Sequence, residues 1–411
     1  MSLGLYISVP FCRTKCSYCN FASDVFSKSA YDNYVARLLE DIANSQDLAS
    51  RIGCTLRAAA NDAADSIYLG GGTPSILEAS QLLRIFAAVR DEFAVAPDAE
   101  ITVECAPGTL APALIETLQQ CGVNRVSLGV QSFVDQEAQS VGRLHNRVTI
   151  LEEIARLRQA GLDNINIDLI AGLPHQTGDS WAFSVSEAIA TGVPHVSVYM
   201  LEVDDDSRLG RELIAGGARY HAHFVPDEDK TADFYQQACE RLTGAGIAQY
   251  EISNFARGTR QSRHNLKYWT RQPYLGFGVD AHSMLGAGKA ALGHQAVRFA
   301  TPDSLDAYMN RAPHNVTPVT APSAIEESFF LGLRLNRGID LQGLWREFGR
   351  EAVGPWESAI QECIQDGLLE QEGTILRLTA RGRLLSNEVF ARFLIEETEE
   401  TKVGTGHVNP R

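Results

Sequence analysis

Two kinds of segment alternate along the first half of the chain. Short β-rich runs predict strands, and the segments between them predict helices. The predicted strands are LYISV (5–9), SIYLGGG (66–72), EITVECAPG (100–108), RVSLGVQS (125–132), NINIDLIAGLP (164–174) and HVSVYMLEV (195–203). The clearest helices are AYDNYVARLLEDIAN (30–44), EASQLLRIFAAVRDEF (78–93) and TILEEIARLRQAG (149–161). Six strand–helix repeats indicate an α/β fold with a parallel sheet and helices outside it.

The regular alternation stops after Val203. The charged segment 204–229, DDDSRLGRELIAGGARYHAHFVPDED, predicts a long surface insertion. A helix at 230–246 and a strand at 248–256 then resume the fold. From about residue 316 a smaller unit begins, and the order helix, short hairpin, helix over 357–394 predicts a winged-helix-like module. We expect this C-terminal domain to cover residues 316–395, followed by a disordered polar tail at 396–411.

Length and composition are those of an ordinary globular protein of about two or three domains, with 411 residues and 45% hydrophobic positions. The chain has no run of roughly 20 apolar residues, and MSLGLYISVP lacks the features of a signal peptide. We therefore expect a cytoplasmic protein without a membrane span, and leave peripheral membrane association open. The formal charge of −15 argues against nucleic-acid binding, because that affinity comes mainly from clustered Lys and Arg.

The eight cysteines do not indicate a disulfide framework, since thiols stay reduced in the cytosol. Five of them are scattered, and we expect each to be a small buried hydrophobic residue. These five are Cys54, Cys105, Cys121, Cys239 and Cys363.

The other three cysteines stand close together in ISVPFCRTKCSYCNFAS (7–23), as Cys12, Cys16 and Cys19. A C-x-x-x-C-x-x-C loop can bring three thiolates to one metal centre. Structural zinc needs four protein ligands, and the chain has no second C-x-x-C. A [4Fe-4S] cluster held by three cysteines instead leaves one iron open to another ligand. We predict such a cluster, with zinc as the alternative.

Polar or glycine residues gather where the predicted strands end, at 70–73, Glu104, Gln131 with Ser132, and Asp168. In barrel-like or doubly wound parallel folds, ligands bind at this edge because several loops converge there. The glycines of GGGTPS would let the backbone approach a ligand and expose amide donors to its carboxylate. The alternative for these glycines is a tight strand-to-helix turn.

The cysteine loop after a first strand resembles that of the radical S-adenosylmethionine (SAM) proteins, and Tyr18 fits the family's aromatic position before the last cysteine. In that family the amino and carboxylate groups of SAM occupy the open iron. The missing fourth ligand would therefore be SAM itself. The resemblance implies a partial (β/α)6, TIM-like barrel with an extension over residues 1–300.

Further segments resemble one branch of this family over about residues 3–390, namely proteins related to oxygen-independent coproporphyrinogen III oxidase. The segments are GGGTPS, VECAPG, RVSLGVQSF, VGRLHNR, NIDLIAGLP, YEISNFA and HNLKYW…YLGFGVDAHS. The resemblance places nine residues around SAM: Tyr6, Tyr18, Gly71, Gly72, Thr73, Glu104, Gln131, Arg143 and Asp168.

The chemistry of these side chains suits SAM. Glu104 and Asp168 can accept hydrogen bonds from its ammonium or ribose hydroxyls, and Arg143 can pair with its carboxylate. Each also has a structural alternative. Glu104, Gln131 and Asp168 could cap adjacent helices, and Arg143 could belong to a surface ion pair.

Two features differ from the true oxidases, which carry a further cysteine two places after the third and a longer N-terminal extension. Here Phe21 stands at that place, and the chain begins a few residues before its first strand. Both departures favour the sister group, the HemW-type haem chaperones. That resemblance implies a protein that binds haem and delivers it to haem proteins such as respiratory enzymes.

The segment HNLKYW resembles a pattern, H-N-x-x-Y-W, of the chaperone group. His264 offers an imidazole for axial ligation of haem iron, and Tyr268 and Trp269 offer flat apolar surface for the porphyrin. Alternatively, His264 only bonds a loop while the two aromatic residues fill core. The other candidates for the haem ligand are His145, His221, His223 and His282.

Three functions follow for testing. The leading one is a haem-binding and transfer protein that carries a SAM-associated iron–sulfur cluster and has no coproporphyrinogen oxidase activity. The second is a radical SAM enzyme, either the oxidase or a C-methyltransferase of the same architecture. The third is a zinc-binding structural protein. The haem ligand, the haem-accepting protein and the oligomeric state are not determined by the sequence.

Overall fold

The computed structural model describes residues 2–56, 63–288 and 294–394. The chain forms two compact units, the first ending at Thr320 and the second beginning at Ala321. The predicted tail at 396–411 lies outside the described residues.

The first unit contains a mixed sheet whose centre is formed by the six predicted strands in sequence order, all parallel. These strands are β1 (Leu3–Val9), β2 (Ala64–Gly71), β3 (Val95–Cys105), β4 (Arg125–Gln131), β5 (Ile165–Ala171) and β6 (His195–Met200). The prediction of an α/β fold with a parallel sheet is confirmed.

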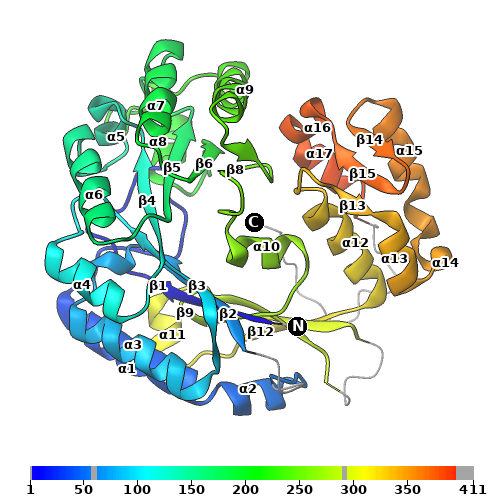
Figure 1. The fold of residues 1–411 in the computed structure, drawn as a ribbon, viewed down its shortest axis with the longest axis horizontal. Coiled ribbons are helices and arrows are strands. Elements are labelled where there is room, and N and C mark those ends of the chain that lie inside the picture. Colours follow the sequence, from blue (N-terminus) through cyan, green and yellow to red (C-terminus); the bar gives the residue numbers. More distant parts are fainter. Residues whose placement is uncertain (1, 57–62, 289–293, 395–411) are drawn as a thin grey trace. The chain divides into compact units, whose positions relative to one another are not determined.

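Helices cover the outer side of this sheet (Figure 1). They are α1 (Lys28–Ala43), α3 (Ala79–Glu92), α4 (Pro112–Gln120), α6 (Arg147–Gln159) and α7 (Gly178–Ala190). The alternation along β1 explains the two faces: Leu5, Ile7 and Val9 are fully buried, whereas Tyr6 points to the inner side, where its ring faces Tyr68. Burying the apolar face of each strand under a helix stabilises the layered fold.

The sheet continues beyond the six strands on both edges. On one edge β9 (Tyr274–Gly278) pairs in parallel with β1, and three antiparallel strands follow. These are β10 (His282–Gly286), β11 (Ala296–Ala300) and β12 (Asn315–Val319). The order of the strands in the described residues is linear, so they form a partial, open barrel.

Two expectations for the later segments need correction. The strand expected at 248–256 is two short antiparallel strands, β7 (Ala248–Gln249) and β8 (Asn254–Ala256), because a turn stabilised by the bond from Asn254 N to Glu251 O separates them. In addition, β12 belongs to the first unit, although its residues fall in the range expected for the second. The reason is its ladder with β11.

The expected surface insertion contains α8 (Arg208–Ala215) and the 3-10 helix η2 (Ala222–Phe224). It is more than a surface excursion, because Leu209 is fully buried and its N–H donates to Ser17 O at 2.8 Å. The Arg208 guanidinium also donates to Lys15 O at 3.2 Å. The insertion is thus bonded directly to the cysteine loop. After it, α9 (Glu228–Gly244) returns to the outer layer, beside α7.

The second unit has a three-stranded antiparallel sheet in the order β13-β15-β14, from Ile339–Asp340, Ile375–Leu378 and Leu369–Glu372. Its main helices are α12 (Ala321–Gly332), α13 (Leu341–Phe348) and α15 (Glu357–Gln365), and two short helices, α16 (Ala380–Leu384) and α17 (Ser386–Ala391), follow the hairpin. This is the expected winged-helix-like order. Its core is aromatic: Phe329 stacks on Phe393 with ring centroids 4.6 Å apart, and Trp356 Nε1 donates to Phe393 O. No helix in the described part of the chain is long and apolar enough to cross a membrane.

Candidate functional site

The cysteine loop follows β1 and is fixed by backbone hydrogen bonds to distant segments. Cys12 N donates to Asp24 O at 3.0 Å, and Ser17 N donates to Val141 O at 3.1 Å. Together with the bond from Leu209 N, these contacts hold the loop between the strand ends and the insertion. A loop tied at several points keeps its thiols in place, which is what a preorganised metal site needs.

One cavity of about 330 Å³ at the carboxyl ends of the strands brings the predicted site residues together. A pocket of this size is in the range of small-ligand sites. Its lining includes Cys12, Cys16, Tyr18, Cys19, Gly71, Gly72, Thr73, Glu104, Gln131, Arg143 and Asp168. Tyr6 does not line it, and instead contacts the cavity residue Tyr68, whose ring centroid is 6.1 Å away.

The three thiols fit the ligand set of a cubane cluster. In the described residues, no group of three or more His, Cys, Asp or Glu side chains is arranged to hold one metal ion. In a [4Fe-4S] cluster each cysteine binds a different iron, so the sulfurs need not meet at one point. Burial raises the pKa of the Cys12 and Cys19 thiols above their ordinary value, and iron would lower it again by binding the thiolates.

Cys105, at the end of β3, also lines the cavity, as sequence reasoning had not foreseen. Its side chain is buried, and its Sγ lies 3.7 Å from Val103 O on its own strand. It therefore packs as the small buried residue that was expected, although beside the cavity. This makes Cys105 the natural comparison for the three loop cysteines.

Two carboxyl groups stand on the inner wall. Glu104 accepts hydrogen bonds from Tyr68 Oη at 2.8 Å and from Gly71 N at 3.1 Å, and Asp168 accepts from Asn166 Nδ2 at 2.7 Å. These partners and Ser127 Oγ, which donates to Asp168 at 3.2 Å, belong to strands β2, β4 and β5, so neither carboxylate caps a helix. Burial raises the pKa of both, that of Glu104 to about 7, with the Asp168 charge acting in the same direction.

The glycine turn plays a different part from the one expected. Gly72 N donates to Val9 O at 2.8 Å and Thr73 N donates to Phe11 O at 2.7 Å, so these amides have protein acceptors and are not free for a ligand. A Cβ on Gly72 would lie 2.7 Å from Phe11 O and 2.8 Å from Val9 O. The glycine is required because the turn packs against the backbone that leads into the cysteine loop.

Gln131 and Arg143 line the cavity, and each has a buried polar atom without a hydrogen-bond partner in the described structure. Buried Gln131 adopts a left-handed conformation with φ 68°, and its Oε1 has no hydrogen-bond partner in the described structure. Arg143 donates to Gly129 O, and its Nη1 lies 3.6 Å from Cys16 Sγ. Arg143 is thus held beside the cysteine loop, not in a surface ion pair. Unsatisfied buried groups in a cavity indicate a place for a ligand.

The inner wall contains further polar residues that sequence reasoning missed. Arg125 is only 2% exposed, lines the cavity, and its Nε has no hydrogen-bond partner among the described residues. Its charge lowers the pKa of Glu104 and Asp168, against the effect of burial. A buried arginine at the first position of a strand, in RVSLGVQS, is the signal that could have revealed it.

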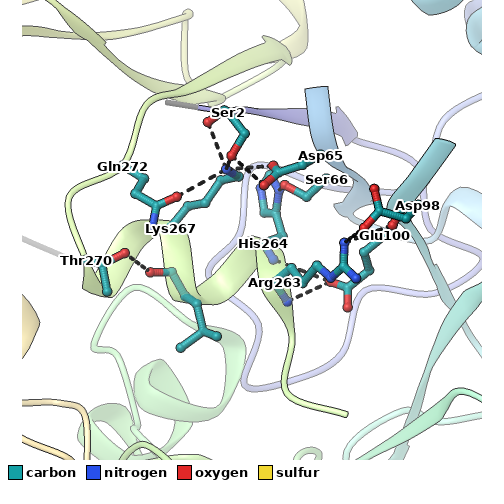
Figure 2. Close-up of polar contacts among 11 residues, drawn as sticks. Ser2, Asp65, Ser66, Asp98, Glu100, Arg263, His264, Lys267, Thr270 and Gln272 are labelled. Atoms are coloured by element: carbon teal, nitrogen blue, oxygen red, sulfur yellow. Dashed lines mark hydrogen bonds and ion pairs between the residues drawn. The ribbon is translucent and has the colours of Figure 1, made fainter. Parts of the chain in front are cut away.

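The candidate haem residues lie elsewhere, on α10 (Arg263–Trp269), which packs on the inner side of the sheet. His264 is 1% exposed, with Nδ1 3.0 Å from Ser66 Oγ (Figure 2). Its Nε2 lies 2.8 Å from Tyr268 Oη. Burial lowers its pKa to about 3. Both ring nitrogens are engaged, so this conformation matches the structural alternative for His264 and offers haem iron no free nitrogen.

Helix α10 is held against the sheet by interactions with charged residues. Lys267 is 2% exposed and forms an ion pair with Asp65 at 2.7 Å, while its ammonium donates to Ser2 O at 2.9 Å. Arg263 N donates to the buried Glu100 at 2.9 Å. Figure 2 shows these contacts closing α10 against the amino-terminal parts of β1, β2 and β3. Tyr268 and Trp269 are partly buried in this layer.

The other histidines differ in their surroundings. His145 is buried, with Nε2 3.0 Å from Val130 O, and burial lowers its pKa to about 4. His282 is exposed and lies 3.8 Å from Asp280. His221 is half-buried beside His175, and His223 is exposed.

Comparisons with known proteins agree with this architecture. A model of the radical SAM superfamily matches residues 6–186, and one of the HemN C-terminal domain matches residues 319–385. The haem chaperone HemW of Bacillus subtilis is 31% identical over 392 residues, which cover 95% of this chain and 99% of that protein. HemW of Lactococcus lactis is 32% identical over 95% of this chain and 97% of its own length. The chain belongs to the HemW family of radical SAM proteins.

A solved structure extends the agreement in fold. The coproporphyrinogen III oxidase HemN of Escherichia coli superposes with a TM-score of 0.79 over 95% of this chain and 89% of that one, at 23% identity. Membership in the radical SAM superfamily implies a [4Fe-4S] cluster and SAM. The three loop cysteines and the adjoining cavity fit both groups.

Proposed function

We propose that this HemW-family protein binds haem and transfers it to haem-dependent proteins such as respiratory enzymes, and that it carries a SAM-ligated [4Fe-4S] cluster. The observation that carries the proposal is similarity to HemW proteins over nearly the whole length of both chains. Phe21 supports it, since it stands where the oxidases place a further cysteine, and it lies 64% exposed at the cavity.

Cys12, Cys16 and Cys19 would hold the cluster, and Arg143 would place a cationic donor beside Cys16 Sγ. Hydrogen bonds and positive charge near a cluster sulfur raise its reduction potential. When bound, the cluster supplies an open iron that SAM can occupy. The insertion is bonded to one side of the loop through Leu209 and Arg208.

The cavity walls would position SAM. Glu104 and Asp168 offer carboxylate oxygens to an ammonium or to ribose hydroxyls, and Gln131 offers its unsatisfied Oε1. Arg143 and Arg125 offer guanidinium groups to a carboxylate. Tyr6 would act indirectly, because it contacts Tyr68, which in turn holds Glu104.

We further infer that the protein works in the cytoplasm and receives and passes haem by contact with other proteins. Its acidic net charge of −15 disfavours nucleic-acid partners.

A test combines two assays on the anaerobically reconstituted full chain. We expect a saturable change in the haem absorption spectrum, and we expect no protoporphyrinogen from coproporphyrinogen III even with reductant and SAM. A known oxidase run in parallel serves as the positive control. Product above the no-protein blank would overturn the chaperone function, and so would the absence of haem binding.

A second candidate is a radical SAM enzyme proper, because the cavity retains an unsatisfied glutamine oxygen and two arginines for SAM. Incubation with SAM and reductant discriminates the two. Formation of 5′-deoxyadenosine in a stoichiometric ratio to a modified substrate would support the enzyme. Haem transfer that proceeds without SAM consumption would support the carrier.

A further inference from the structure

Two histidines far apart in the sequence meet beside the insertion. His175 lies in the turn between β5 and α7, and His221 immediately precedes η2. His175 Nε2 is 3.2 Å from His221 Nδ1, and the ring centroids are 5.0 Å apart. The backbone N–H of His175 also donates to Phe224 O at 3.1 Å. The pair is therefore held by both side-chain and backbone contacts.

Both histidines have an unfavourable backbone conformation, with φ of 69° for His175 and 61° for His221. A left-handed conformation costs a residue other than glycine about 1 kcal/mol or more. Such strain persists where the surrounding structure enforces it, often at functional positions. Here Glu212 fixes the backbone on both sides of His221, because its carboxylate accepts from Tyr220 N at 2.8 Å and Ala222 N at 3.1 Å.

The 3.2 Å contact between the two rings allows a tautomer in which one nitrogen of His221 is available. If Nδ1 of His221 donates its proton to Nε2 of His175, then Nε2 of His221 carries a free lone pair. Metal-binding histidines commonly have this arrangement, in which the second ring nitrogen donates to a partner that orients the imidazole. Burial and the neighbouring His221 lower the pKa of His175, which favours the neutral imidazole that accepts this bond.

Phe224 lies against the pair, and α8 of the same insertion carries further exposed apolar and cationic side chains. Phe224 is 47% exposed, and its ring centroid lies 4.1 Å from that of His175. Leu213 and Ile214 on α8 are 56% and 68% exposed. A hollow on the same segment is lined by Arg208, Arg211, Glu212, Gly216 and Tyr220. Exposed apolar groups next to arginines suit a flat apolar ring with carboxylate substituents.

We propose that His221 Nε2 is the axial ligand of haem iron, with His175 as its positioning residue and Phe224 against the porphyrin face. The inference rests on the proposed haem binding and assigns its site to the insertion, not to α10. Arg208 and Arg211 are the partners for the haem propionates. Because Leu209 and Arg208 bond the cysteine loop, the haem site and the cluster loop share one structural support.

Haem titration of the reconstituted full chain tests the assignment. We expect His221→Ala to shift the Soret band and to weaken haem affinity by about tenfold or more. His221→Met should retain binding but change the spectrum to that of a thioether ligand. His282→Ala, at an exposed histidine on β10 and outside the insertion, should match the wild type. Iron content and circular dichroism equal to wild type will show that the variants fold.

The positioning role of His175 can be tested separately by measuring haem affinity. His175→Ala should weaken haem binding by about tenfold with the iron ligand retained, and His175→Gln should recover affinity, because its amide oxygen can accept the Nδ1 proton. An unchanged haem spectrum and an unchanged haem affinity in His221→Ala would overturn the proposal. Failure of the wild type to bind haem would instead contradict the proposed function.

Discussion

The carboxyl end and the amino end of the partial barrel use polar residues in opposite ways. At the carboxyl end, Gln131 and Arg143 line the cavity, and Gln131 Oε1 and Arg143 Nε have no hydrogen-bond partner in the described structure. At the amino end, His264 and Lys267 are as deeply buried, yet each ring nitrogen and the ammonium have partners. Unsatisfied groups indicate a ligand site, whereas satisfied groups hold the structure together.

The charged groups at the two ends of the partial barrel also differ. Burial raises the pKa of Glu104 and Asp168, and among the described residues neither carboxylate forms an ion pair with a lysine or arginine. Asp65 and Lys267 instead form a close pair that neutralises both charges. The carboxylates at the carboxyl end can thus receive a cationic or hydrogen-bonding ligand, whereas Lys267 and His264 at the amino end already have partners.

The largest expected effect concerns the cysteines at the carboxyl end. Cys12→Ala, Cys16→Ala or Cys19→Ala should each remove the cluster, because two thiolates cannot replace three. Cys105→Ala, at a buried cysteine lining the same cavity, should keep wild-type iron and sulfide content. Anaerobic iron and sulfide analysis measures both. Loss of iron in Cys105→Ala would mean that a fourth protein ligand exists.

At the amino end we expect a smaller effect, which changes the stability of the fold and not the binding of a ligand. Lys267→Met should lower the free energy of unfolding by about 3 kcal/mol, because it leaves Asp65 without its buried partner. The matched control is Lys230→Ala, whose pair with Asp227 is largely exposed and should contribute less than about 1 kcal/mol. Denaturant unfolding gives both values. If the two variants lost equal free energy of unfolding, the buried ion pair at the amino end would contribute no more than the surface pair.

The smallest effect concerns Glu104 and depends on pH. Its pKa of about 7 in the folded protein exceeds the ordinary value of 4.5, so between these values the folded state binds a proton that the unfolded state does not. The free energy of unfolding therefore falls as pH rises through this window. Glu104→Gln should remove this dependence and be more stable at pH 8 by about 2 kcal/mol.

The same variant should bind SAM more weakly, because the carboxylate charge is lost. Denaturation at pH 5 and pH 8, with calorimetry of SAM, measures both changes. A wild-type pH profile in Glu104→Gln would assign the titration to another group, with Asp168 as the first to examine. Wild-type SAM affinity would remove Glu104 from the SAM site.

The sequence by itself was sufficient to predict the main strands and helices and to predict an iron–sulfur cluster. The six parallel strands and the main helices follow from short-range patterns of apolar residues, which act over a few residues and need no knowledge of the fold. The spacing of the three loop cysteines, which is also a short-range pattern, predicted the metal site. The polar strand ends could be grouped because parallel strands bring their carboxyl ends to one edge.

Contacts between distant segments were decided only by the tertiary structure. The sequence could not reveal that Gly72 N donates to Val9 O, or that both nitrogens of His264 find partners on β2 and α10. Nor could it bring His175 beside His221, 46 positions later. A hydrogen bond depends on a few tenths of an ångström and on which groups a neighbour has already satisfied. Those quantities are fixed by packing of the whole chain, so the same imidazole can be a structural group on α10 and an available ligand beside η2.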